Sequence, residues 1–215
     1  FQDHARTFHD ARRGDPAARA PLIALASNPQ IPAIVRATAQ SELGRLPAIA
    51  SEGVIRLGLD DPDPLVRIAA LRNLSPQPAE IRLRWAQERL ADPVLGVRID
   101  AAQALADISP ETVQEPVRGQ LTRAFAEFEA AQALNLIRRG RPDAAEAELR
   151  AGLALDPAAV ELAVNLADLL RQHGRDPEGE AVLRQAIAVA PKEPYPHHAL
   201  GLALVRQRRY PEALE

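Results

Sequence analysis

Residues 60–74 read DDPDPLVRIAALRNL, and residues 91–105 read ADPVLGVRIDAAQAL. The two stretches keep an Asp-Pro, a Val-Arg, an alanine and a leucine in register, while most of the other residues differ. We call the sequence interval between equivalent residues of the two stretches the short step. A third copy surrounds Val35-Arg36, one short step earlier. Similarity at a fixed step of this kind is typical of chains built from stacked supersecondary units.

Each of the three copies predicts two helices joined by a turn that contains proline. Asp61 and Asp92 are expected at the N-cap end of the second helices, where a carboxylate suits both the free N–H groups and the helix dipole. Pro62 and Pro93 follow them, at positions where a missing N–H costs little. The expected helices span 16–27 and 31–46, 49–59 and 63–75, and 78–91 and 94–108.

These three units resemble short HEAT repeats. The resemblance rests on the recurring spacing between Asp61 and Arg67 and between Asp92 and Arg98, which in HEAT arrays builds a hydrogen-bonded ladder between neighbouring repeats. In the first unit Gln30 replaces the aspartate, so we expect the ladder to weaken there. We interpret the arginines as structural, because a planar guanidinium suits buried pairing between helices. The expected ladder residues are Asp61, Arg67, Asp92, Arg98 and Arg36.

A different and slightly longer step follows Ile108. It separates Gly140 from Gly174 and also Pro157 from Pro191, and we call it the long step. Helix pairs of this length that end in proline resemble the tetratricopeptide repeat. The resemblance implies units at 126–159 and 160–193 and a truncated unit at 194–215, although Gly179 stands where the second unit should carry alanine.

The sequence therefore predicts an all-α fold, an α-solenoid of HEAT-like helix pairs followed by tetratricopeptide helix pairs. An N-terminal helix is expected at 1–15, three HEAT-like units at 16–108, a connecting segment at 109–125, and the tetratricopeptide units at 126–215. In the truncated last unit, Leu200, Leu204 and Leu214 are expected to lack part of their cover.

The tetratricopeptide resemblance implies a groove that is lined by the first helix of each unit. Such a groove binds an extended peptide or a partner helix. The residues expected to line this groove lack the lysines with which chaperone-binding relatives hold a C-terminal carboxylate. Their absence disfavours ligands of that class. The competing interpretation is that these residues are only solvated positions on a spacer. The expected groove residues are Glu127, Leu134, Ile137, Glu161, Val164, Asn165, Asp168, Arg171, Tyr195 and His198.

Composition and motifs argue against several classes of function. The 215 residues include no cysteine, so disulfides, thiolate metal sites and a cysteine nucleophile are impossible in this chain. A net charge of -3 disfavours nucleic-acid binding, and no long apolar run predicts a membrane span. The five histidines form no metal motif, and no phosphate loop or GxSxG motif occurs. We predict no catalytic residue, no metal and no cofactor here, and a protein or peptide partner.

Three functions follow from the sequence, of which a noncatalytic interaction module is favoured. The chain opens and ends within helical patterns, so we expect a piece of a larger protein, with further sequence before Phe1 and beyond Glu215. The order of repeats resembles the C-terminal region of some bacterial multihaem c-type cytochromes, which implies haem sites upstream and a periplasmic location; otherwise we expect a cytoplasmic one. An enzyme on a HEAT scaffold, such as a lyase or a glycosylase, is the third alternative, and the missing acid-base set counts against it.

Overall fold

The computed structural model describes residues 2–46 and 52–214, which form twelve α-helices and four short 3-10 helices and contain no strand. The helices pack in neighbouring pairs, which confirms the predicted all-α solenoid class. The chain divides into two compact units, unit 1 (Phe1–Leu121) and unit 2 (Thr122–Glu215).

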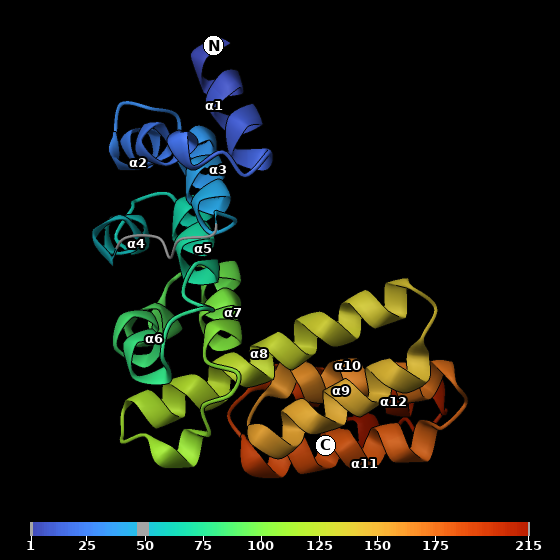
Figure 1. Ribbon diagram of the computed structural model, residues 1–215. Coiled ribbons are helices and arrows are strands. Elements are labelled where there is room, and N and C mark those ends of the chain that lie inside the picture. Colours follow the sequence, from blue (N-terminus) through green and yellow to red (C-terminus); the bar gives the residue numbers. More distant parts are fainter. Residues whose placement is uncertain (1, 47–51, 215) are drawn as a thin grey trace. The chain divides into compact units, whose positions relative to one another are not determined.

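Unit 1 begins with α1 (Gln2–Arg12) and continues as three helix pairs. Figure 1 shows the first helices of these pairs in one column and the second helices in another column beside it. The predicted helices are found at their expected places, except that residues 49–51 lie outside the described residues. The pairs are α2 (Arg19–Ser27) with α3 (Ala33–Leu43), α4 (Glu52–Leu59) with α5 (Pro64–Arg72), and α6 (Ala79–Ala86) with α7 (Leu95–Ala104). Three 3-10 helices accompany the pairs: Pro16–Ala18 precedes α2, Gln87–Ala91 lies between α6 and α7, and Pro110–Thr112 follows α7.

The turns before α5 and α7 differ from the predicted capping. The N-cap of α5 is Asp63, whose carboxylate accepts a hydrogen bond from Leu65 N at 2.9 Å. Asp61 instead accepts from Asp63 N, and Asp92 accepts from Val94 N, both at 2.9 Å. The two predicted caps therefore brace the turn that precedes each helix, because an aspartate side chain readily bonds the amide two residues on.

A buried amide pair joins the first two helix pairs of unit 1. Gln40 is fully buried, and its Nε2 donates to Val54 O at 2.8 Å while Asn73 Nδ2 donates to Gln40 O at 2.7 Å. A Cβ added to Gly58, on α4, would lie 2.5 Å from Gln40 Nε2 and 2.8 Å from Ala70 Cβ. The close approach of α4 to α3 and α5 thus depends on the absence of a side chain at Gly58.

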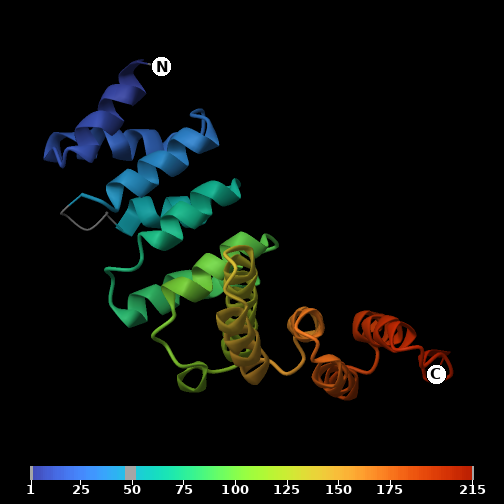
Figure 2. The ribbon, with the colours of Figure 1, turned by 90° about the vertical axis from the view of Figure 1, so that its right-hand side faces the viewer.

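Unit 2 contains most of α8 (Val117–Arg138) and the four helices that follow it. They are α9 (Pro142–Leu155), α10 (Val160–Gln172), α11 (Asp176–Val189) and α12 (Pro194–Arg206), and a 3-10 helix at Glu212–Leu214 follows α12. Figure 2 shows α10, α11 and α12 nearly end-on. Because α8 begins at Val117, half of the expected connecting segment 109–125 is helical. The core between α8, α9 and α10 is built from alanine and leucine: Ala126, Ala133, Ala145, Leu149, Leu162, Leu166, Leu169 and Leu170.

The first helix of each tetratricopeptide-like pair ends in the same backbone motif. The second residue after each helix has a left-handed conformation, with φ of 68° at Gly140, 71° at Gly174 and 62° at Arg208. The next N–H then donates back to a carbonyl five residues earlier, which is the Schellman arrangement. These bonds join Arg141 to Leu136, Arg175 to Leu170 and Arg209 to Leu204, at 2.9, 2.9 and 3.0 Å. Only the third copy places a non-glycine residue at the left-handed position.

The burial of the three leucines named in the truncated last unit differs in part from the expectation. Leu204 is buried, contrary to the expectation, whereas Leu200 is half-buried and Leu214 is 90% exposed, so both of these lack part of their cover as predicted. The exposed leucine and valine of α12 are instead Leu202 and Val205. Leu204 is covered because it points toward the inside of unit 2, as Leu170 does one long step earlier.

Candidate groove of unit 2

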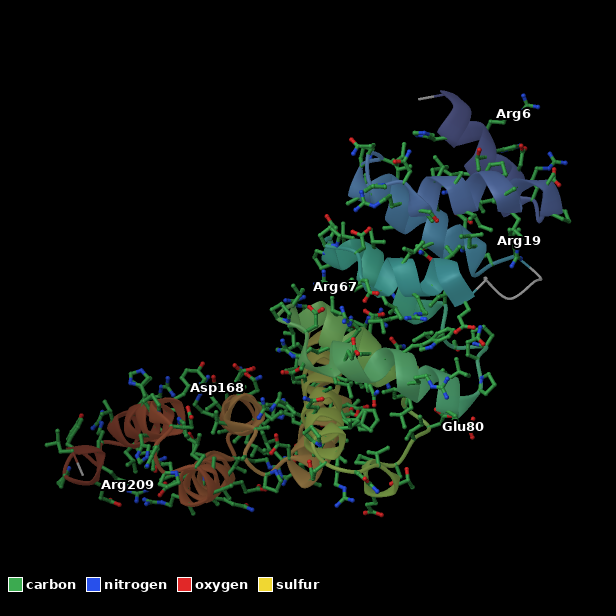
Figure 3. All side chains as sticks on the ribbon, turned by 90° about the vertical axis from the view of Figure 1, so that its left-hand side faces the viewer. Arg6, Arg19, Arg67, Glu80, Asp168 and Arg209 are labelled. Atoms are coloured by element: carbon green, nitrogen blue, oxygen red, sulfur yellow. The ribbon has the colours of Figure 1, made fainter. Side chains whose placement is uncertain are left out.

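A groove of about 260 Å³ lies between α10, α11 and α12. Two first helices form its walls, and α11, which packs against both of them, forms its floor. Its aliphatic surface comes from Val164, Ala167, Leu183, Ala199, Leu202 and Ala203. Figure 3 labels Asp168 on the α10 wall. The groove is partly open to solvent rather than enclosed.

Half of the ten expected groove residues line this groove. They are Val164, Asp168, Arg171, Tyr195 and His198. Of the other five, Glu127, Leu134 and Ile137 belong to α8, and Ile137 packs against the core of α8, α9 and α10. Glu161 and Asn165 belong to α10 but are not part of the lining.

The floor of the groove was not predicted. Asp176, Gly179, Glu180 and Leu183 of α11 all line it. Gly179 matters most for the packing, because a Cβ there would lie 3.0 Å from Ala167 O of α10. The replacement of the usual alanine by Gly179 was the available sign that α11 approaches α10 closely at this point.

Most charges at the groove are neutralised within unit 2. Asp168 pairs with Arg171 at 3.2 Å. Glu180 lies between Arg209 at 2.6 Å and Arg184 at 2.9 Å. Burial works to raise the pKa of Glu180, but the hydrogen bonds from the two arginines outweigh it and hold the pKa below its usual value. These carboxylates are therefore already satisfied and offer little to a basic ligand.

The ion pairs of Glu180 with Arg184 and Arg209 have an equivalent between the preceding helix pairs. We call each such group of ion pairs between successive helix pairs a joint. In the preceding joint, Arg175 pairs with Glu146 at 2.7 Å, and Arg150 pairs with the same carboxylate at 2.9 Å. Each of these arginines and glutamates recurs one long step later, as Glu180, Arg184 and Arg209. A fourth member, Glu178 and then Glu212, completes each joint by pairing with Arg175 and Arg209. We did not predict this ladder, although its recurrence at the long step is visible in the sequence.

Unit 1 has its own ladder, which recurs at the short step. Arg36 makes a two-pronged pair with Asp61, from Nε at 2.9 Å and Nη2 at 2.7 Å. Arg67 Nη2 donates to Asp92 Oδ1 at 2.9 Å; its Nε lies 2.9 Å from Oδ2, but the N–H does not point at that oxygen. Arg67 Nη1 also donates to Asp61 O at 2.9 Å, and Arg98 Nη1 donates to Asp92 O at 2.8 Å. Arg36 and Arg67 thus each tie their own turn to the carboxylate of the next helix pair (Figure 3, Arg67).

Two carboxyl groups meet between α8 and α9. Burial is the main reason that the pKa of Glu129 is raised to about 7, and the hydrogen bond and negative charge of Glu148 raise it further. Glu129 also lies against the helix contact at Gly152, where an added Cβ would be 3.2 Å from Glu129 Cβ. Because the pKa of Glu129 lies at about 7, this carboxyl loses its proton close to neutral pH.

We expect this pair to make unit 2 less stable as pH rises from the ordinary glutamate pKa to about 7. The folded state holds the Glu129 proton more tightly than the unfolded state does, so stability is lost as pH passes through the raised folded value. Glu129→Gln should raise the free energy of unfolding at pH 8 by about 1 to 2 kcal/mol, less than the full shift implies because water screens the half-exposed group.

Urea denaturation at pH 5 and pH 8 measures this difference. Glu161→Gln, which changes an exposed carboxylate on α10, is the matched control and should leave the pH dependence unchanged. If Glu129→Gln and the parent chain lose the same stability between the two pH values, the assignment of the raised pKa to Glu129 is wrong.

Metal ligands and membrane spans were also sought in the described residues. Within residues 2–46 and 52–214, no three histidine, aspartate or glutamate side chains are grouped so that they could hold a metal ion. No helix in that part of the chain is long and apolar enough to cross a membrane. Of the adjacent histidines, His197 lies with its Nε2 3.1 Å from Pro191 O, whereas His198 faces the groove.

Comparison with known proteins bears on unit 2. No curated protein sequence matches the chain. Residues 136–203 match the family model of the tetratricopeptide repeat, and this range holds the end of α8, all of α9, α10 and α11, and most of α12. The predicted tetratricopeptide character of this part of the chain is therefore supported by the family match and by its helix pairs, whereas the match does not extend to the predicted HEAT-like units.

Proposed function

We propose that the chain is a noncatalytic protein-interaction module whose groove in unit 2 binds an extended peptide segment of a partner protein. The observation that carries the proposal is the groove itself. Apolar side chains of both walls and Leu183 of the floor are presented between two first helices, together with polar residues at some of the positions that the tetratricopeptide resemblance implies. Tetratricopeptide repeats generally mediate protein–protein interactions, which supports the same conclusion.

The stability of the walls also supports this proposal. The Glu180–Arg209 joint ties α11 to the turn after α12, so the groove is held open before any ligand binds. A preformed groove lowers the ordering cost of binding, and affinity then depends on what the ligand buries. Leu202, with 42% of its surface exposed, is the apolar wall leucine most available to a ligand.

Unit 1 serves this function as a scaffold in the same proposal. Its three helix pairs and its Arg36–Asp61 and Arg67–Asp92 joints support a HEAT-like interpretation. Nothing among the described residues favours the alternatives of a cytochrome accessory region or an enzyme over a binding module.

Peptide selection followed by a paired substitution tests the proposed groove. Peptides are selected on the chain from a phage-displayed library, synthesised, and measured by fluorescence anisotropy. Leu202→Asp should weaken binding about tenfold or more, because it places a charge on the apolar wall. Leu155→Asp, on α9 outside the groove and comparably exposed at 40%, should leave binding unchanged. Selection that enriches no peptide, or equal losses in the two variants, would contradict the proposal.

A further inference from the structure

Two guanidinium groups near the end of α12 have no carboxylate partner among the described residues. Arg206 lines the groove, and Arg208 follows two residues later. Neither makes an ion pair within the part of the chain that the structure describes, although the other arginines around the groove, Arg171, Arg184 and Arg209, all do. Arg206 therefore places a guanidinium without an ion-pair partner at the end of the groove where α12 finishes, and Arg208 lies exposed just beyond the lining.

Arg208 occupies a backbone position that suits glycine. Its φ is 62°, and the equivalent residues one and two long steps earlier are Gly174 and Gly140. Steric crowding is not the reason for glycine at these two positions, because a Cβ on either would meet nothing within 4 Å. The left-handed conformation itself is the cost for a residue with a Cβ. In the last copy, a guanidinium thus stands where the fold alone favours a glycine.

The carboxylates at this end of the groove form no ion pair with Arg206 or Arg208. Asp168 is paired with Arg171, and Glu180 is held by Arg184 and Arg209. Asp176 is the first residue of α11, where the helix dipole stabilises a carboxylate. The described carboxylates thus leave both exposed guanidinium groups available to an acidic side chain of a ligand.

We infer that the groove binds a segment in which an acidic side chain flanks apolar residues. This inference rests on the proposed peptide-binding function. The apolar side chains contact Val164, Leu183 and Leu202, and the acidic side chain is bound at the end of α12 by Arg206 and Arg208. A charge-assisted bond to a guanidinium is among the stronger contacts in a partly exposed site and selects the ligand's register in the groove.

Two matched pools of synthetic peptides test the inference. All members are nonapeptides with acetylated and amidated ends, so that no terminal carboxylate is present, and all carry Leu-Leu at the centre. Flanking positions are drawn from Ala, Ser and Glu in one pool and from Ala, Ser and Gln in the other. We expect the Glu pool to bind about fivefold more tightly at about 0.05 M salt, with most of the preference lost at about 0.5 M.

Variants of the two arginines assign the preference to this end of the groove. Arg206→Gln and Arg208→Gly should each reduce the preference for the Glu pool. Arg208→Gly should at the same time raise the melting temperature by roughly 1 to 4 °C, because it relieves the left-handed strain. Arg138→Gln is the matched control, since Arg138 ends α8 as Arg206 ends α12, and it should change neither.

The outcomes separate the inference from the proposed function. Equal binding of the two pools, with binding still lost in Leu202→Asp, would overturn the acidic-ligand inference and leave the groove intact. An unchanged preference in Arg208→Gly and Arg206→Gln would also overturn it. Failure of both pools to bind would overturn the inference together with the proposed function.

Discussion

Replacing Arg67 by alanine should lower the free energy of unfolding by about 2 to 4 kcal/mol. Arg67 is buried and holds the buried carboxylate of Asp92, which belongs to the next helix pair. It also donates to the carbonyl groups of Asp61 and Pro62, both at 2.9 Å. Its removal leaves a buried charge and two carbonyl groups without their donor, and such losses exceed the usual effect of a surface substitution.

Urea denaturation followed by circular dichroism measures this loss. Arg84→Ala, which removes an exposed arginine of α6 that makes no ion pair among the described residues, should change stability by no more than about 0.5 kcal/mol. Asp92→Asn should partly rescue Arg67→Ala, because the unpaired charge disappears while the bond from Val94 N can remain. An Arg67→Ala chain as stable as the parent would show that the unit 1 ladder contributes nothing to stability.

Gly58→Ala should lower the free energy of unfolding by about 2 to 3 kcal/mol. An alanine in a helix is normally favourable by up to about 1 kcal/mol, so the sign of this result depends on packing. The new methyl group would lie 2.5 Å from Gln40 Nε2 and 2.8 Å from Ala70 Cβ. It must either displace the buried amide from Val54 O or push α4 away from α5, and both changes are costly in a close-packed interior.

Gly53→Ala is the control for this prediction, because Gly53 lies on the same helix and a Cβ there would meet nothing within 4 Å. It should leave stability unchanged or raise it by at most about 1 kcal/mol. Chemical denaturation of both variants separates the two effects, helix propensity and steric overlap. If both substitutions were equally harmless, the described contact between Gln40 and Gly58 would be wrong.

The helix pairs could be predicted because the two steps repeat residues whose role depends on position alone. Leu43, Leu74 and Leu105 recur at the short step, and each is buried. A leucine that recurs at a fixed step indicates a core position in each unit, whatever the neighbouring turns do. This is why the helices were found at their expected places, while their ends moved by a few residues.

The groove could be predicted only in part, because its floor and walls have different origins. The walls follow from positions on the first helices, which is how Val164, Asp168 and Tyr195 were found. The floor depends on how closely α11 approaches α10, which is a tertiary property, and Gly179 was a sign of it that we did not use. The ion pairs between the helix pairs of unit 2 were missed for another reason. Glu146 and Arg175 belong to different helix pairs and are far apart in the sequence, so neither local pattern nor helix spacing connects them.

The equivalent joints of unit 2 have a consequence for how such a chain can change its number of repeats. In each joint, a glutamate of one pair meets an arginine of the next. Removing one long step in frame would bring Glu146 opposite Arg209, and duplicating it would create a further joint of the same kind. Unit 1 allows the same exchange at the short step, where Arg36 would meet Asp92. Recombination within either array therefore preserves the ion pairs between successive helix pairs. An exchange between the two arrays would instead leave arginines and carboxylates at positions where they cannot pair.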